Sequence, residues 1–216
     1  MYSSSHQSDR LAKLNVADAV AEPHRPGFKS HKAPVAIQYA HRWHRDALIQ
    51  LTLMEDILEI SRDERVRVSP DGEMVLILKS TNGALALRLS EGREFADQEL
   101  DGAESMPVVS LMRSQIYREP ICSTARMVWA TRLTRISVGD RMRILRATSN
   151  GDTPLGELDQ LVSDRTIDPF SAIGRLICEG ALSIPLDKPI SPETMVRRVG
   201  GNSPKGGEGF SLLPRS

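Results

Sequence analysis

The chain runs to 216 residues but has no histidine after His44. A triad of serine, histidine and aspartate needs a histidine as its base, so this lack weakens any proposal of that class of hydrolase. Cysteine is scarce as well, because only Cys122 and Cys178 are present. Two cysteines cannot build a disulfide scaffold and their spacing fits no zinc site, so we expect two buried structural thiols.

The sequence also lacks a long apolar run and a net charge. No stretch approaches the roughly 20 apolar residues of a membrane-spanning helix, and the N-terminus lacks the apolar stretch of a signal peptide. No glycine-rich phosphate loop precedes a predicted helix. We therefore expect a reduced, cytoplasmic protein with no membrane partner and no cofactor.

The balance of 28 basic and 28 acidic residues hides an uneven distribution. Residues 55–104 hold thirteen acids and six bases, whereas residues 123–146 hold six arginines and a single acid, Asp140. An arginine-rich block of this kind is the electrostatic footprint of a phosphate binder. The charge pattern thus indicates DNA as a partner for the second half of the chain.

The first half predicts one helix followed by strands. Apolar residues recur at three- and four-residue steps from Tyr39 to Ile60, which predicts an amphipathic helix. A strong hairpin turn at Thr81-Asn82-Gly83 and an acidic surface loop at 91–104 separate the later strands. The predicted strands are Arg65–Val68, Met74–Lys79, Ala84–Leu89 and Pro107–Met112, the last of them buried.

Two amphipathic helices are predicted next. The first is Ser123–Arg135, with Ser123 as its N-cap, and the second is Val138–Ala147. Val128, Trp129 and Leu133 share one face of the first helix, so we expect all three to be buried.

The segment after these helices contains residues that mark the start and the end of helices. A short helix is predicted within Asp152–Leu158. A second begins after the N-cap candidate Asp168, which a proline follows, and ends at Gly180 in the position of a C′ glycine. Leu182–Arg198 then predicts a small hairpin. Helix, turn, helix and a two-stranded wing is the arrangement by which proteins place one helix in a DNA major groove.

Several phrases of this half resemble a known family in their order and spacing. They are Ser114-Gln-Ile116-Tyr-Arg118-Glu119-Pro120, Arg143-Ile-Leu-Arg146, Leu155-Gly156-Glu157-Leu158, Asp168-Pro169, Gly180-Ala-Leu182 and the run from Leu186 to Arg198. Together they resemble the C-terminal half of TnsA-like proteins, the endonuclease subunits of heteromeric bacterial transposases. The resemblance covers Ser114–Arg198 well and Tyr39–Ser90 weakly. It implies an α/β (α+β) chain, in which a reduced restriction-endonuclease-like domain precedes a helical winged-helix domain.

In that family the nuclease half holds magnesium with a helical Glu, a strand Asp and a Glu/Gln-x-Lys motif on the next strand, because hard cations prefer carboxylate oxygens. Arg45-Asp46 matches an Arg-Asp pair of the family's helix. The ligand positions themselves fall on His44, Val75, Arg88 and Ser90. Since none of these suits a magnesium site, the resemblance implies a degenerate nuclease half with no catalytic residue and no metal ligand.

Other metal arrangements stay open. His41 and His44 lie three residues apart on the predicted helix, a spacing that can place two imidazoles on one metal, with Asp46 or another residue as third ligand. Asp71 and Glu73 can imitate a carboxylate pair, although a turn is the ordinary interpretation of the Asp-Gly sequence. Two surface histidines and a turn aspartate are the simpler interpretation, so no metal is predicted.

Seven arginines are candidate DNA contacts: Arg126, Arg132, Arg135, Arg141, Arg143, Arg146 and Arg175. An alternative of similar weight for those of the first helix is a solvated face that pairs with acidic residues. On the helix that would enter the groove, Arg175 alone can make a strong base contact, so that helix reads few bases directly. Winged-helix domains also dock proteins.

These inferences divide the chain into a disordered arm (1–34), a degenerate nuclease-like α/β domain (35–120), a helical winged-helix domain (121–199) and a flexible tail (200–216). We predict a non-catalytic TnsA-like accessory protein of a transposon or other mobile element. It would bind the DNA backbone and dock a transposase or recombinase. The alternatives are a stand-alone winged-helix regulator, a protein scaffold whose arginines form internal ion pairs, and a still-active metal-dependent TnsA-like endonuclease.

Overall fold

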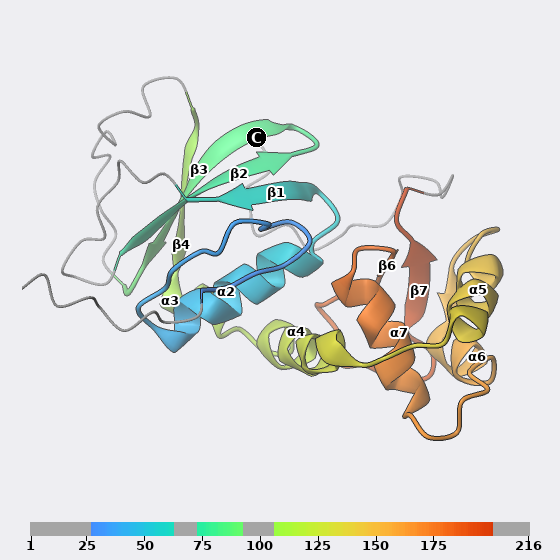
Figure 1. Cartoon of the computed structure of the whole chain (residues 1–216). Helices are drawn as coiled ribbons and strands as arrows, with labels where there is room; N and C mark the ends of the chain where they lie inside the picture. Colours follow the sequence, from blue (N-terminus) through green and yellow to red (C-terminus); the bar gives the residue numbers. More distant parts are fainter. Residues whose placement is uncertain (1–26, 63–72, 93–105, 201–216) are drawn as a thin grey trace, which may run out of the picture.

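A computed structural model describes residues 27–62, 73–92 and 106–200. Within these ranges the chain has an α+β fold, with a larger sheet in the N-terminal half and a mostly helical C-terminal half (Figure 1). Four predicted features lie outside the described residues in whole or large part: the arm up to residue 26, the strand Arg65–Val68, the acidic loop and the tail after residue 200.

A four-stranded mixed sheet forms the N-terminal half. Its spatial order is β1 (Ile57–Ser61), β2 (Met74–Ser80), β3 (Gly83–Ser90) and β4 (Val108–Met112). The first three strands are antiparallel, and β4 is parallel to β3. Gly83 follows the β2–β3 turn with φ 123°, a conformation that glycine adopts without a Cβ clash. The predicted hairpin is therefore confirmed.

Helix α2 (Arg42–Leu53) lies against the sheet (Figure 1) and ends earlier than predicted. The predicted helix Tyr39–Ile60 is wrong in its last turns, because Met54 is extended and β1 pairs with β2. An irregularity between Ile57 and Glu59 shifts the register of β1, and both Ile57 and Ile60 are buried. Two buried residues three apart imitate helical spacing, and strand pairing overrides it.

Strand β4 also differs from its prediction. It was expected to be buried, yet among its residues only Leu111 is fully buried and Val108 is 43% exposed. The reason is its place at the edge of the sheet, where one side of the strand has no neighbouring strand among the described residues. The short helix α3 (Arg113–Ile116) follows it directly.

Residues 27–37, called the strap below, are packed rather than part of a disordered arm. Phe28 forms a β-bridge with Ile37 and stacks on Trp129, with ring centroids 5.1 Å apart. His31 Nδ1 donates to the carbonyl of Cys178 at 2.9 Å, and Lys32 Nζ donates to the carbonyl of Met54. The strap therefore satisfies carbonyls at the C-terminal ends of two helices, one from each half of the chain.

The C-terminal half contains α4 (Ile121–Ala130), the 3-10 turn η1 (Thr131–Leu133), α5 (Val138–Ala147), α6 (Leu155–Asp159) and α7 (Pro169–Cys178). Three short antiparallel strands form a second sheet in the order β5 (Thr153–Pro154), β7 (Met195–Arg198) and β6 (Leu182–Ser183). Helix α5 has its predicted bounds. The predicted hairpin is present as β6 and β7.

The predicted ends of α7 are confirmed. Asp168 Oδ2 accepts from the backbone N–H of Ser171 at 2.9 Å, so Asp168 is the N-cap. Gly180 has φ 75°, the left-handed conformation of a C′ residue. Both signals are local in the sequence, which is why they could be recognised there.

Three details of the other predicted helices are wrong. Helix α4 begins at Ile121 with Pro120 as its N-cap, and Ser123 donates to the Pro120 carbonyl from within the first turn. Leu133 is 77% exposed, because the tighter η1 turn rotates it away from the face that carries Val128 and Trp129. Thr153–Pro154 is a strand, so the short helix starts only at Leu155.

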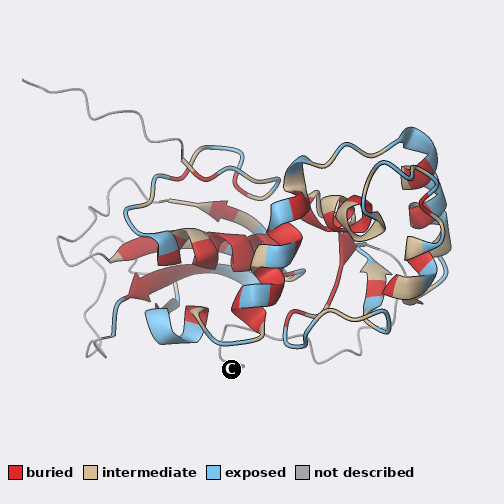
Figure 2. Ribbon diagram, turned by 90° about the horizontal axis from the view of Figure 1, so that it is seen from below, coloured by how far each residue is buried: buried red, intermediate tan, exposed pale blue. Residues whose placement is uncertain are grey.

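One hydrophobic core continues through both halves (Figure 2). Helix α4 packs against α2 on one side and α7 on the other. Buried residues of all three helices belong to the same cluster, including Leu48, Val128 and Ile173. The predicted domain boundary near residue 120 therefore falls inside a continuous core.

Candidate nucleic-acid interface

Five of the seven candidate arginines have side-chain hydrogen bonds or ion pairs with residues that the structure describes, and two have none among those residues. The five are Arg126, Arg132, Arg141, Arg143 and Arg175. An arginine held by an internal carboxylate or carbonyl is partly neutralised or oriented by it, so its availability to DNA must be judged case by case.

Arg126 joins the two halves of the chain. Its Nε lies 3.0 Å from Asp46 Oδ1 and its Nη2 lies 2.5 Å from Oδ2, a bidentate ion pair between α4 and α2. The Asp46 side chain is 2% exposed and that of Arg126 is 38% exposed. The hydrogen bond to Asp46 raises the pKa of Arg126 above its ordinary value. The guanidinium also lies 5.5 Å from the centroid of the Tyr117 ring. Arg126 is thus a structural residue.

Arg141 and Arg175 share one carboxylate. Arg141 Nη2 lies 2.5 Å from Glu179 Oε2, and Arg175 Nε lies 2.6 Å from Glu179 Oε1. Burial raises the pKa of Glu179 and the two arginines lower it, with a net decrease. Glu179, just after α7, therefore ties α5 to α7.

Arg143 belongs to a network around a buried acid. Asp140 is 1% exposed and accepts from Ser137 Oγ at 2.7 Å, from the Ser163 backbone N–H at 2.8 Å, and from Arg143. The hydrogen bonds from Ser163 and Ser137 hold the pKa of Asp140 well below its usual range. Arg143 Nε also donates to the Leu161 carbonyl at 2.9 Å. This network fixes the start of α5 against the loop that follows α6.

Arg135 and Arg146 are the two remaining candidates. Both are exposed, and neither side chain has a hydrogen bond or ion pair with any residue that the structure describes. Arg135 lies before the start of α5, and Arg146 lies in its last turn. Of the seven predicted contacts, these two have guanidinium groups that no described residue occupies.

Helix α7, expected to enter the major groove, offers no open face. Six of its ten residues are buried and the others are partly buried. It packs against η1, α4, α5 and α6. Gly174 shows how close this packing is, because a Cβ there would lie 2.5 Å from Thr131 Oγ1. Direct base reading by α7 would require it to leave these contacts.

The four positions that the sequence resemblance assigned to metal ligands are all buried. His44 is 0%, Val75 7%, Arg88 7% and Ser90 2% exposed. Val75 and Arg88 are direct partners across β2 and β3, so the sheet does bring two of these positions together. Among the described residues no group of three or more His, Cys, Asp or Glu side chains is arranged to hold a metal. Asp46, considered as a ligand, is instead the partner of Arg126, and Asp71 lies outside the described residues.

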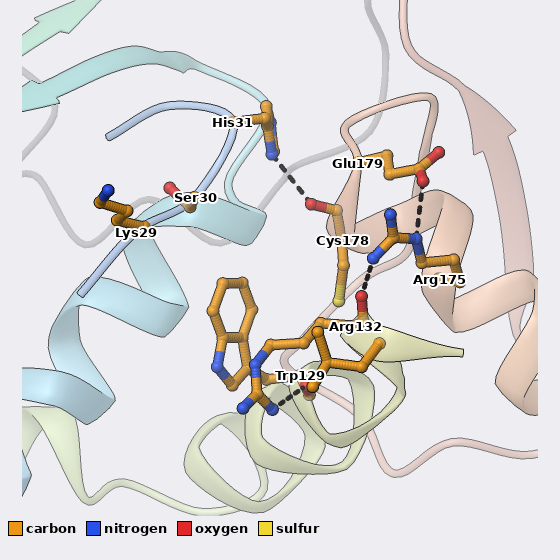
Figure 3. Close-up of a pocket in the computed structure, with 9 residues that line it drawn as sticks. Lys29, Ser30, His31, Trp129, Arg132, Arg175, Cys178 and Glu179 are labelled. Atoms are coloured by element: carbon orange, nitrogen blue, oxygen red, sulfur yellow. Dashed lines mark hydrogen bonds and ion pairs between the residues drawn. The ribbon is translucent and has the colours of Figure 1, made fainter. Parts of the chain in front are cut away.

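A pocket at the junction of the two halves was not predicted. It has a volume of about 370 Å³ and lies between the strap, the end of α4 with η1, and the end of α7 (Figure 3). Its charged lining comprises Lys29, Arg132, Arg175 and Glu179, and His31 is also part of the lining. His31 and Cys178 are 147 residues apart in sequence, and no local pattern connects the strap to α7.

The two cysteines behave as expected. Both are buried and free. Burial raises the pKa of Cys178 to about 11, and it raises that of Cys122 as well. A thiol with a raised pKa is a poor nucleophile at neutral pH, so both are structural.

Comparison of the chain with protein-family models, with curated proteins and with solved structures finds no match. Among the described residues, no helix is both long enough and apolar enough to span a membrane.

Proposed function

We propose that this protein is a non-catalytic TnsA-like accessory protein of a mobile element, which binds the DNA backbone and docks a transposase or recombinase. One observation carries the proposal. The order α5, β5, α6, α7, β6, β7, with the strands arranged β5-β7-β6 after a mixed sheet, supports a winged-helix unit in this proposal. His44, Val75, Arg88 and Ser90, buried at the positions of the family's metal ligands, support the absence of catalysis.

The proposal assigns fewer arginines to DNA contact than the sequence indicated. Arg135 and Arg146 carry the DNA contacts, because their guanidinium groups are exposed and make no internal pair among the described residues. The buried face of α7 disfavours a stand-alone regulator that reads a defined sequence, since no α7 residue is exposed. Binding should therefore be to the backbone and independent of sequence.

A second candidate function is a protein-interaction scaffold without a DNA role. The internal pairing of five arginines favours it, as do exposed apolar side chains around α5. Leu133 is 77%, Val138 78% and Met142 63% exposed. Exposed apolar side chains that form a contiguous patch are typical of docking surfaces, and Val138 and Met142 are one helical turn apart on α5.

Salt-dependent DNA binding separates the two functions. Fluorescence anisotropy with labelled duplexes of unrelated sequence measures the slope of log K against log salt concentration. Replacing Arg135 and Arg146 together by glutamine should reduce that slope by about two, since each lost phosphate contact removes about 0.9. Arg118→Gln is the control for the loss of a surface arginine, because Arg118 is exposed and its side chain has no hydrogen bond or ion pair with a described residue. Absence of binding at low salt, or an unchanged slope in the double variant, would leave the scaffold function.

A supercoiled-plasmid nicking assay with magnesium or manganese tests the non-catalytic part. We expect no cleavage above background. Asp46→Asn and Arg126→Met break the same ion pair, so they form a matched pair. Robust cleavage that Asp46→Asn abolishes and Arg126→Met retains would show Asp46 to be a ligand, and the protein to be an active nuclease.

A further inference from the structure

The pocket between the strap, η1 and the end of α7 has no part in the proposed DNA contacts. It is a concave site of about 370 Å³, to which three separate segments of the chain contribute (Figure 3). Pockets of this size are typical of sites for small molecules. Its lining therefore indicates what kind of ligand would fit.

Positive charge predominates in the lining. Lys29, Arg132 and Arg175 contribute three cations, and Glu179 contributes the one carboxylate. That carboxylate already accepts from Arg175 and from Arg141, which lies outside the lining. The charge of Glu179 is thus balanced by two guanidinium groups, and the pocket keeps a positive potential that favours an anion.

The arginines are held in place before any ligand binds. Arg175 Nη1 donates to the Arg132 carbonyl, and Arg132 Nη1 donates to the Trp129 carbonyl at 3.1 Å (Figure 3). The Arg132 guanidinium lies 5.5 Å from the centroid of the Trp129 ring. A guanidinium has five N–H donors. These contacts use one donor of Arg132 and, with the Glu179 bond, two of Arg175.

The strap completes the site from the other side. His31 Nδ1 donates to the Cys178 carbonyl at 2.9 Å, so a helix-end carbonyl that would repel an anion is already satisfied. Lys29 is exposed, and its ammonium has no hydrogen bond or ion pair with a described residue. Trp129, Leu133 and Cys178 supply apolar wall beside the cations.

We propose that this pocket binds the phosphate group of an organic phosphate ligand. Lys29, Arg132 and Arg175 supply the positive charge that attracts the phosphate, and the apolar wall accommodates the group to which it is attached. The volume leaves room for more than a bare phosphate ion. A free nucleotide and a DNA backbone both present phosphate oxygens to such a pocket. The experiment distinguishes these two sources of the phosphate.

Isothermal titration calorimetry on the full chain tests the proposal with three probes: inorganic phosphate, adenosine monophosphate and a short DNA duplex. We expect saturable binding of adenosine monophosphate, tighter than that of inorganic phosphate. Lys29→Gln and Arg132→Gln should each weaken it about tenfold or more, as loss of a charge-assisted hydrogen bond implies. Lys29→Gln removes no hydrogen bond or ion pair within the described residues, so we expect the variant to fold like the wild type.

Arg118→Gln is the charge-matched control and should leave binding of adenosine monophosphate unchanged. Competition between the duplex and adenosine monophosphate for the wild-type pocket identifies a backbone phosphate as the ligand, and lack of competition identifies a free nucleotide. Absence of saturable binding of both small probes, or equal affinity in wild type and in Lys29→Gln, would overturn the pocket assignment. The double variant at Arg135 and Arg146 separates the two proposals, because its affinity for adenosine monophosphate should equal that of the wild type even though its duplex binding is weakened.

Discussion

Breaking the ion pair between Arg126 and Asp46 should destabilise the protein without changing how DNA binding depends on salt. Arg126→Met keeps an unbranched side chain over Tyr117 but leaves the Asp46 carboxylate, 2% exposed, without its charged partner. Loss of one partner of a fully buried pair costs about 3–5 kcal/mol. Because the Arg126 side chain is 38% exposed, water screens the pair, and we expect about 2–3 kcal/mol instead.

The two single variants should differ in a definite direction. Asp46→Asn leaves a guanidinium that can reach water, whereas Arg126→Met leaves a carboxylate that cannot, so Arg126→Met should cost more. Urea unfolding followed by far-ultraviolet circular dichroism gives both free energies and, with the double variant, the coupling between the residues. For a chain of this length, the loss in Arg126→Met corresponds to a fall in Tm of roughly 4–12 °C.

The DNA measurement completes this test. The slope of log K against log salt should be the same in Arg126→Met as in the wild type, measured below the Tm of both. Two results would refute the structural role of Arg126: a coupling energy below about 0.5 kcal/mol, or a slope reduced by about one, as expected for a lost phosphate contact.

Two further substitutions test other contacts. Hydrogen bonds lower the pKa of Asp140 in the folded state. They therefore stabilise the fold when the pH is above 3.8, the ordinary pKa of an aspartate in the unfolded chain, and this stabilisation is lost as the pH falls below that value. Asp140→Asn should therefore lower the unfolding free energy at pH 7 and flatten its dependence on pH in acid urea titrations; an unchanged acid limb would contradict this. Gly174→Ala should destabilise by about 1–3 kcal/mol, because its Cβ would lie 2.5 Å from Thr131 Oγ1. The matched variant Gly139→Ala, where the nearest atom is 3.4 Å away on the flexible Arg143 side chain, should have no such cost in thermal unfolding, and equal losses in both would refute the packing argument.

Much of the fold could be predicted because the relevant signals are local. The Asp168 cap, the Gly180 stop, the β2–β3 turn and helix α5 each depend on residues within one or two turns of chain. The strand at Ile57–Ser61 was missed because burial three residues apart fits both a helix and an irregular strand. Its state was decided by hydrogen bonding to β2, which the local pattern does not contain.

The candidate site was predicted only as a set of residue types. The sequence by itself determined that the arginines are concentrated in residues 123–146. The assignment of His44, Val75, Arg88 and Ser90 to the ligand positions of a TnsA-like nuclease stays a prediction. Which arginines are available was decided by tertiary structure. Asp46 lies 80 residues from Arg126 in sequence, and only the packing of α4 on α2 brings their charges together.

The same reason explains the strap and its pocket. The composition of the N-terminal segment is typical of disordered chains. In the structure, however, Phe28 stacks on Trp129 and His31 donates a hydrogen bond to the Cys178 carbonyl at the end of α7. Local propensity, capping and turn chemistry act over a few residues, and these the sequence determined. Charge pairing and pocket formation act through space between distant segments, so only the tertiary structure decided which cations stay free and where an anion fits.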